Sequence, residues 1–239
     1  MTRTGIVLAA LLCTLLPVGG AWVAAAADVE PMAPPVDADG HFWVYGEVAN
    51  DNGSFVARPE TAVASGWMPG EVMSILDEEQ TSIKCTEQPH AGNVCWRVVV
   101  KNWVDPYWCG IAWFTKDGAK DKKFEPDEAW PSYDLSRAKK LVFWAKGAEG
   151  DEVFQVKIGI LYDKGPYGDQ SRFPIASKWL KATAEWKRYE VPLTDYSSRL
   201  KRIVNPFCLI LSRDTQGDNR NGMTLFLDDI YYEIAPAEK

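Results

Sequence analysis

Two adjacent carboxylates lie inside an apolar, strand-forming stretch near the C-terminus. The stretch MTLFLDDIYYE, residues 223–233, carries Asp228 and Asp229 at its centre. Side chains alternate between the two faces of a strand, so these carboxylates are expected to point in opposite directions, at least one of them toward the apolar side. A buried carboxylate is costly unless a positive group or hydrogen-bond donors accompany it.

Three explanations for this charge remain open at the level of sequence. A calcium ion could bind Asp228 together with oxygens from another segment, because calcium takes six to eight hard oxygen ligands. A buried arginine or a set of backbone amides could satisfy the charge instead, or the pair could be solvated at a sheet edge. Glu47 interrupts a similarly aromatic strand at the other end of the domain. Since chain ends of a domain tend to lie close together, Glu47 and Asp228 could share one cation.

The same residues argue against catalysis. A glycosidase needs two carboxylates that face each other across a cleft, which neighbours on one strand cannot do. The chain has two histidines, His41 and His90, and no glycine-rich phosphate loop, so Ser-His-Asp chemistry, a histidine metal site and nucleotide chemistry are disfavoured. The sequence therefore indicates a binding protein, not an enzyme.

Aromatic residues supply the candidate binding groups. The chain has 11 tryptophans, of which Trp22 lies in the N-terminal segment discussed below. Those within strand-like runs are expected in the core: Trp96, Trp113 and Trp144. Exposed rings in turns can stack on the apolar faces of sugars, while polar neighbours bond the hydroxyls. On this basis the predicted ligand-binding residues are Trp103, Trp108, Trp130, Tyr167 and Arg172.

These side chains must be positioned by short strands. About nine strand-like runs are separated by Gly, Pro, Asp and Asn clusters, at 42–48, 71–76, 94–101, 108–114, 139–146, 152–162, 186–193, 207–212 and 224–233. No regularly alternating helices separate them, so the prediction is an all-β fold, a two-sheet antiparallel β-sandwich. Short helical turns are expected only within LSRAKKL (135–141) and YSSRLKRIV (196–204).

The N-terminus indicates export. Residues 1–27 have a basic start, a short apolar stretch and small residues up to Ala27, which predicts a signal peptide. Residues 28–40 are Pro- and Asp-rich and are expected to form a disordered leader or linker, followed by a single domain at 41–239. We therefore expect a secreted, periplasmic or cell-surface protein without a membrane span. The formal net charge of -7 argues against nucleic acid as a partner.

Removal of the signal peptide leaves four cysteines. In an oxidising compartment an even number favours disulfides, and four cysteines allow three connectivities. Cys85 and Cys95 flank a loop containing Pro, Gly and Asn, so a bond between them is the first expectation. A bond between Cys109 and Cys208 follows by elimination, with two buried free thiols as the alternative.

Taken in order, several stretches resemble the secreted carbohydrate-binding modules with the galactose-binding-like jelly roll. They are FWVYGE, SGWMPGE, PHAGNVCWRV, WCGIAWF, DLSRAKKLVFWAKGAEGDE, EWKRYEVPL and LFLDDIYYE, and they span about residues 41–234. A lysine-rich loop after WCGIAWF stands where such modules are expected to carry an Asn-Trp-Gly turn.

The resemblance implies a jelly roll with a structural calcium near the joined chain ends, held by Glu47 and Asp228, with Asp229 as the fallback. It also implies reversible, non-catalytic binding of a polysaccharide or glycan. The alternative expectation is a structural or protein-interaction sandwich within a surface protein complex, without a sugar site.

Overall fold

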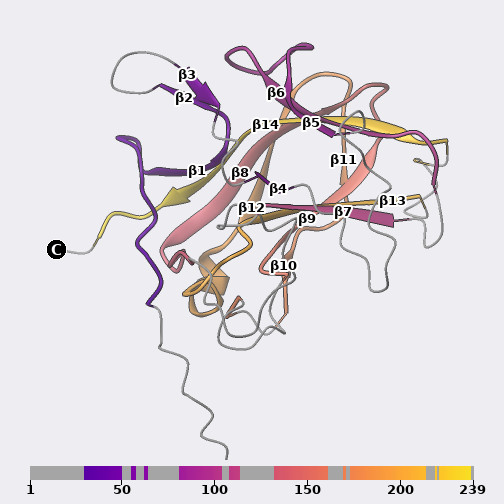
Figure 1. The fold of residues 1–239 in the computed structure, drawn as a ribbon. Helices are drawn as coiled ribbons and strands as arrows, with labels where there is room; N and C mark the ends of the chain where they lie inside the picture. Colours follow the sequence, from indigo (N-terminus) through magenta and orange to yellow (C-terminus); the bar gives the residue numbers. More distant parts are fainter. Residues whose placement is uncertain are drawn as a thin grey trace, which may run out of the picture.

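The computed structural model describes residues 30–49, 55–57, 62–63, 81–103, 108–113, 132–160, 169–170, 173–213, 219 and 221–237. The regular secondary structure of the described chain is almost entirely β-strand (Figure 1). The strands are β1 His41–Tyr45, β2 Glu47–Ala49, β3 Phe55–Ala57, β4 Ala62–Val63, β5 Thr81–Cys85, β6 Cys95–Val100, β7 Trp108–Trp113, β8 Ala138–Gly147, β9 Val153–Ile158, β10 Ile175–Ala176, β11 Leu180–Lys181, β12 Lys187–Pro192, β13 Phe207–Ser212 and β14 Met223–Ile234. A 3-10 helix, η2 (Thr194–Arg199), follows β12.

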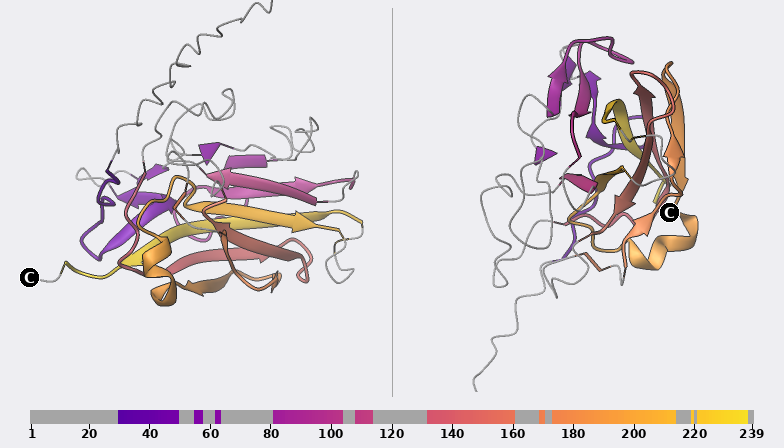
Figure 2. Two further views of the ribbon diagram at one scale, coloured as in Figure 1. Left: turned by 90° about the horizontal axis from the view of Figure 1, so that it is seen from below. Right: turned by 90° about the vertical axis from the view of Figure 1, so that its right-hand side faces the viewer.

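Two six-stranded antiparallel sheets make up the sandwich, and β2 and β3 form a separate two-stranded sheet (Figure 2). The first has the strand order β12-β8-β14-β6-β5, and β1 pairs with the C-terminal half of β14, beyond the segment that pairs with β6. The second has the order β10-β9-β13-β7-β4, with β11 also paired to β9. The predicted two-sheet antiparallel β-sandwich is therefore confirmed.

The core lies between the two sheets and is strongly aromatic. Trp96 of the first sheet meets Trp113 of the second edge to face, with ring centroids 5.1 Å apart. Phe143 and Phe154 make a similar contact across the layers at 6.2 Å. Each such ring buries a large apolar area, which makes this cluster the main stabilising element. The predicted core positions of Trp96 and Trp113 are confirmed, because both are fully buried.

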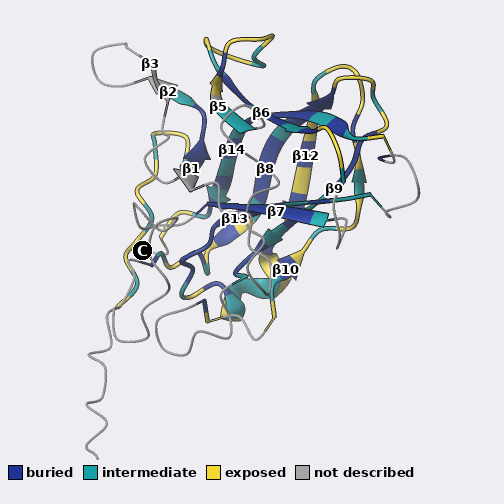
Figure 3. Cartoon of the chain, turned by 45° about the vertical axis from the view of Figure 1, so that its right-hand side comes forward, coloured by how far each residue is buried: buried dark blue, intermediate teal, exposed yellow. Residues whose placement is uncertain are grey.

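Alternation explains why these sequences form strands with one face inward. In β12, KRYEVP, Tyr189 and Val191 are buried, while the alternate residues Arg188, Glu190 and Pro192 are exposed. Strand β8 is mostly buried, whereas β12 at the edge of the same sheet has exposed stretches (Figure 3). The first sheet therefore leaves part of its outer face accessible to solvent.

The segment before β1 differs from the expected disordered leader. Met32 forms a parallel bridge with Tyr133, with the Met32 N–H donating to Ser132 O at 2.8 Å and the Asp134 N–H donating to Met32 O at 2.8 Å. Gly40 O accepts the Ile234 N–H at 3.0 Å. Met32 and Gly40 thus tie this segment to the sandwich through their backbones, while most of its side chains are exposed. The predicted signal peptide lies outside the described residues.

Candidate functional site

Aromatic doublets place rings on the outer face of the first sheet. In β1, Phe42 is buried in the core and its neighbour Trp43 is half-buried on the outside. In β8, Phe143 points into the core and Trp144 points out. Since neighbours on a strand face opposite ways, each doublet supplies one ring to the core and one to the outer surface. The expected core position of Trp144 is therefore wrong.

The same rule holds in β14, where Tyr231 is half-buried on the outer face and Tyr232 is fully buried. Tyr231 is the register partner of Trp43 on one side and of Val142 on the other. Its ring centroid lies 4.9 Å from that of Trp43 and 4.3 Å from that of His41. These rings form a continuous aromatic patch across β1 and β14.

Four charged side chains border the aromatic patch. Lys140 Nζ lies 2.9 Å from Glu190 Oε1 and 3.2 Å from Glu233 Oε1. Arg188 also contacts both carboxylates, with one of its terminal nitrogens 3.2 Å from Glu233 Oε1. All four are partly exposed and come from the neighbouring strands β8, β12 and β14. We call the combined surface of Trp43, Tyr231, Trp144, Lys140, Arg188, Glu190 and Glu233 the platform.

The segment between β5 and β6 closes one side of the platform. His90 stacks on Trp144 with ring centroids 3.8 Å apart and an interplanar angle of 19°. The Trp186 indole N–H donates to Gln88 O at 3.0 Å. The Lys146 ammonium donates to the side-chain amide oxygen of Gln88. One face of Trp144 is therefore occupied by protein, whereas Trp43 and Tyr231 lie beyond this cover.

A β-bulge explains the acidic doublet. The pairing of β14 with β8 shifts register between Asp228 and Tyr231, and Asp229 has a φ of 47°. The bulge breaks the strict alternation, so both carboxylates meet His90. The expectation that they face opposite ways is therefore wrong.

Backbone amides satisfy the buried carboxylate. Asp228 Oδ2 accepts the N–H groups of His90 at 3.0 Å and Ala91 at 3.4 Å, and its Oδ1 accepts the Asp229 N–H at 2.9 Å. His90 Nδ1 lies 2.7 Å from Asp229 Oδ2. Burial, together with the charge of Asp229, raises the pKa of Asp228 to about 7, although the three amides oppose this shift.

Glu47 is satisfied in the same way. Its Oε2 accepts the backbone N–H of Asn93 and, at 3.3 Å, that of Val94. Gly92 has a φ of +64°, a left-handed conformation that favours glycine, and a Cβ there would meet the Glu47 carboxylate. Glu47 and Asp228 thus bind successive parts of one loop.

These contacts do not suit the predicted calcium ion. Amide N–H groups point at the oxygens that would have to face the metal, and a calcium site needs several oxygens converging on one point. Among the described residues, the one set of three metal-binding groups in mutual reach is Asp37, Asp39 and His41. Asp37 Oδ1 there accepts the backbone N–H groups of Asp39 and His41 within a turn. The calcium ion stays a prediction, and the contacts favour the backbone-amide alternative.

The predicted ligand-binding residues are not brought together on one surface. Trp103 packs against the core and donates its indole N–H to Asn219 O at 2.6 Å. Trp108 begins β7, whose alternate residues Cys109, Ile111 and Trp113 face the core, so Trp108 lies on the outer face of the second sheet. The remaining predicted residues lie outside the described residues: Trp130, Tyr167 and Arg172.

All four cysteines are buried free thiols in the structure, which does not show the predicted disulfides. Leu211 is the register partner of Cys109, three positions from Cys208 on β13, so Cys109 and Cys208 point to opposite faces of the sheet. A bond between them is excluded by this register. Cys85 and Cys95 are direct register partners on β5 and β6. Burial raises the pKa of Cys109 and of Cys208 to about 12, which makes both thiols poor nucleophiles.

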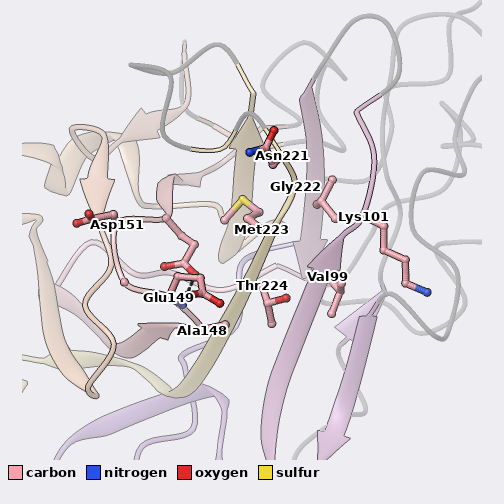
Figure 4. A pocket seen from close by; sticks show the side chains of 12 residues that line it. Val99, Lys101, Ala148, Glu149, Asp151, Asn221, Gly222, Met223 and Thr224 are labelled. Atoms are coloured by element: carbon pink, nitrogen blue, oxygen red, sulfur yellow. Dashed lines mark hydrogen bonds between the residues drawn. The ribbon is translucent and has the colours of Figure 1, made fainter.

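A pocket of about 330 Å³ lies at the opposite end of β14 from the platform (Figure 4). Glu152 is buried there, and its Oε1 accepts the Glu149 N–H at 2.9 Å. None of the lining residues is aromatic; they are Val99, Val100, Lys101, Ala148, Glu149, Gly150, Asp151, Glu152, Asn221, Gly222, Met223 and Thr224. The pocket therefore lacks the rings that stack on sugars, which are found on the platform.

A two-sheet sandwich with half-buried rings and charged groups on one sheet face suits a carbohydrate-binding module. The family comparison agrees with this class. The model of the family described as carbohydrate binding domain 30 matches residues 61–233, and the chain belongs to this family. The resemblance to carbohydrate-binding modules and the expectation of a non-catalytic protein are thereby confirmed.

One solved structure shares this fold, and two others are similar at lower TM-scores. A crystal structure of a family 30 carbohydrate-binding module is 18% identical, covers 83% of this chain and 90% of its own, and has a TM-score of 0.51. A family 30 module of a cellulosomal cellulase of Clostridium thermocellum is 16% identical, with 82% and 99% coverage and a TM-score of 0.48. A family 11 module from Clostridium thermocellum, in complex with a β-1,3-1,4-mixed-linked tetrasaccharide, is 13% identical, with 66% and 84% coverage and a TM-score of 0.42. No curated protein sequence matches the chain.

Proposed function

We propose that the chain binds a polysaccharide on the platform. The observation that supports this most directly is the aromatic patch of Trp43 and Tyr231, next to the charged residues of β8, β12 and β14. Rings that are half-exposed on a sheet face can stack on a sugar, and charged groups at their border can bond its hydroxyls. The polar groups already contact one another, so their positions are largely fixed before a ligand arrives.

The chemistry of the platform favours a glycan with flat pyranose rings. A pyranose whose hydroxyls are equatorial presents an apolar face to an aromatic ring and directs its hydroxyls sideways, toward groups such as Arg188 and Glu190. Glucose has such rings, and in a β-linked glucan the glycosidic bond is equatorial as well, so successive rings can lie extended and flat, whereas the axial bond of an α-linked glucan bends the chain. The cover of His90 on Trp144 leaves the β1 side of the platform, with Trp43 and Tyr231, as the open part.

Affinity electrophoresis of the chain against soluble polysaccharides tests the proposal. We expect retardation by a β-glucan such as a mixed-linked glucan or xyloglucan, and less or none by an α-glucan. A folded protein that no polysaccharide retards would contradict glycan binding and would favour the alternative of a protein-interaction domain in a surface complex.

We also propose that the protein acts outside the cell, at a surface or in the periplasm. The support is the N-terminal sequence and the carbohydrate-binding family. In the described part of the chain, no helix has the length and apolarity to cross a membrane. In an oxidising compartment Cys85 and Cys95, as register partners, are the pair placed for oxidation.

A further inference from the structure

Asp37, in the segment before β1, holds the indole of Trp43. The Trp43 indole N–H donates to Asp37 Oδ2 at 2.7 Å. The other oxygen, Oδ1, accepts the backbone N–H groups of Asp39 at 3.0 Å and His41 at 2.8 Å. One carboxylate oxygen therefore closes a turn, while the other fixes the ring of a platform residue.

The turn itself is anchored to the sandwich. The Asp37 N–H donates to His41 O at 3.0 Å, and the Gly40 N–H donates to Asp37 O at 3.1 Å. Gly40 O in turn accepts the N–H of Ile234, the last residue of β14. Further upstream, Met32 pairs with Tyr133. Asp37 is thus held from both sides and can fix Trp43 in place.

Other neighbours restrict the same ring. Tyr231 lies against Trp43 at 4.9 Å with a 44° tilt. A Cβ added at Gly46 would lie 2.9 Å from a ring carbon of Trp43, so a side chain at this position would push the ring away. Together these contacts leave the indole little freedom, which reduces the entropy lost when a sugar stacks on it.

We propose that Asp37 is a positioning residue of the carbohydrate site and that the segment before β1 is a functional part of the module. This inference rests on the proposed function. Residues 30–45 lie outside the segment matched by the family model, 61–233, so the match assigns them no role. Because the indole N–H is donated to Asp37, Trp43 contacts the sugar through its ring and not by hydrogen-bond donation.

The lowered pKa of Asp37 agrees with this role. Burial acts to raise this pKa, but the hydrogen bond from Trp43, those from the His41 and Asp39 amides and the proximity of the His41 ring together outweigh it. The carboxylate is therefore ionised at neutral pH, as a strong acceptor for the indole must be.

A double-mutant cycle on the full chain tests the inference, with the dissociation constant for the polysaccharide that wild type binds as the readout. Asp37→Asn retains an oxygen for the turn but presents an amide N–H₂ group to the indole, so we expect roughly three- to tenfold weaker binding. Trp43→Phe removes the indole N–H while leaving Asp37 in place. In the Trp43→Phe background, Asp37→Asn should have no further effect.

Asp39→Asn is the matched control, because Asp39 contributes its backbone amide to the turn, its side chain is exposed, and the Trp43 indole N–H donates to Asp37 and not to Asp39. It should bind like wild type. Thermal unfolding of each variant separates weaker binding from loss of the fold.

If Asp37→Asn binds like wild type while Trp43→Ala loses binding, the positioning role is refuted and the proposed function stands. If Asp37→Asn weakens binding equally in both backgrounds, its effect does not act through the indole, and the inference fails. If wild type binds no polysaccharide, the proposed function fails and this inference fails with it.

Discussion

Two neighbouring tyrosines on β14 provide a sharp test of which sheet face binds the ligand. Tyr231 lies on the outer face, within the aromatic patch, whereas Tyr232 is fully buried and contacts Pro206 O through its hydroxyl. Substituting each by alanine removes the same side chain from adjacent positions. The two variants should therefore separate ligand binding from stability.

The expected effects follow from burial. A sugar covers one ring face, roughly a third of the 150–250 Å² of an aromatic side chain; about 60 Å² at about 25 cal/mol/Å² gives ~1.5 kcal/mol. Tyr231 also supports Trp43 and His41, and each aromatic pair is worth about 0.5–1.5 kcal/mol. Tyr231→Ala should therefore weaken binding by about 1.5 kcal/mol, roughly tenfold in Kd, while the loss of the two aromatic pairs should lower the free energy of unfolding by about 1–3 kcal/mol.

Tyr232→Ala should show the opposite pattern. It leaves a cavity in the core and should cost about 3–5 kcal/mol of unfolding free energy, with little change in Kd while the protein remains folded. Isothermal titration calorimetry with the bound polysaccharide and chemical denaturation measure the two quantities. A folded Tyr231→Ala protein whose Kd stays within twofold of wild type would refute the assignment of the outer face.

Three further predictions concern residues that the sequence pointed to. Trp103→Ala should lower the melting temperature without changing glycan affinity, because Trp103 packs on the core; lost affinity with unchanged melting would restore it as a ligand contact. A chelator should leave the melting temperature unchanged, because amides satisfy the carboxylates of Glu47 and Asp228; a decrease that added calcium reverses would instead support the calcium predicted from sequence. The pKa of Asp228 is raised from 3.8 to about 7, so the folded state holds an extra proton between these values, and the free energy of unfolding should fall as pH rises from about 4 to 7, by up to about 4 kcal/mol. Denaturation midpoints across this range check it, and Asp228→Asn should remove the slope.

Most of the strands could be predicted from the sequence because each has its own apolar pattern. The runs at 139–146, 186–193 and 224–233 correspond to β8, β12 and β14. The apolar pattern of each run is clear enough to predict a strand without knowledge of its partner strands. LSRAKKL was expected as a helical turn, but β8 already begins at Ala138, since Leu141 and Phe143 need to face the core. Strand β5 was missed because TSIKC contains few apolar residues and is defined by its pairing with β6.

The candidate site was harder to predict because its rings lie on strands, whereas the exposed tryptophans were expected in loops. The doublets FW (42–43), FW (143–144) and YY (231–232) lie in recognisable strands, and alternation requires one ring of each to leave the core. The doublets therefore predict outward rings at these positions, although a tryptophan within a strand, such as Trp144, is by itself expected in the core. The roles of Asp37 and His90 could not be read from sequence, because their partners Trp43 and Trp144 are brought to them by turn geometry and long-range pairing.

The bulge at Asp228 and Asp229 connects the question of the buried charge with that of the binding site. The bulge turns both carboxylates toward the segment between β5 and β6. Asp228 accepts the backbone N–H of His90, and Asp229 contacts the His90 ring, so His90 is fixed in place. His90 is then held on Trp144 and covers that side of the platform. The acidic doublet thus affects the sheet face indirectly, because it determines where the open aromatic surface ends. The part of the platform that a glycan chain can reach is the β1 side, where Asp37 holds Trp43.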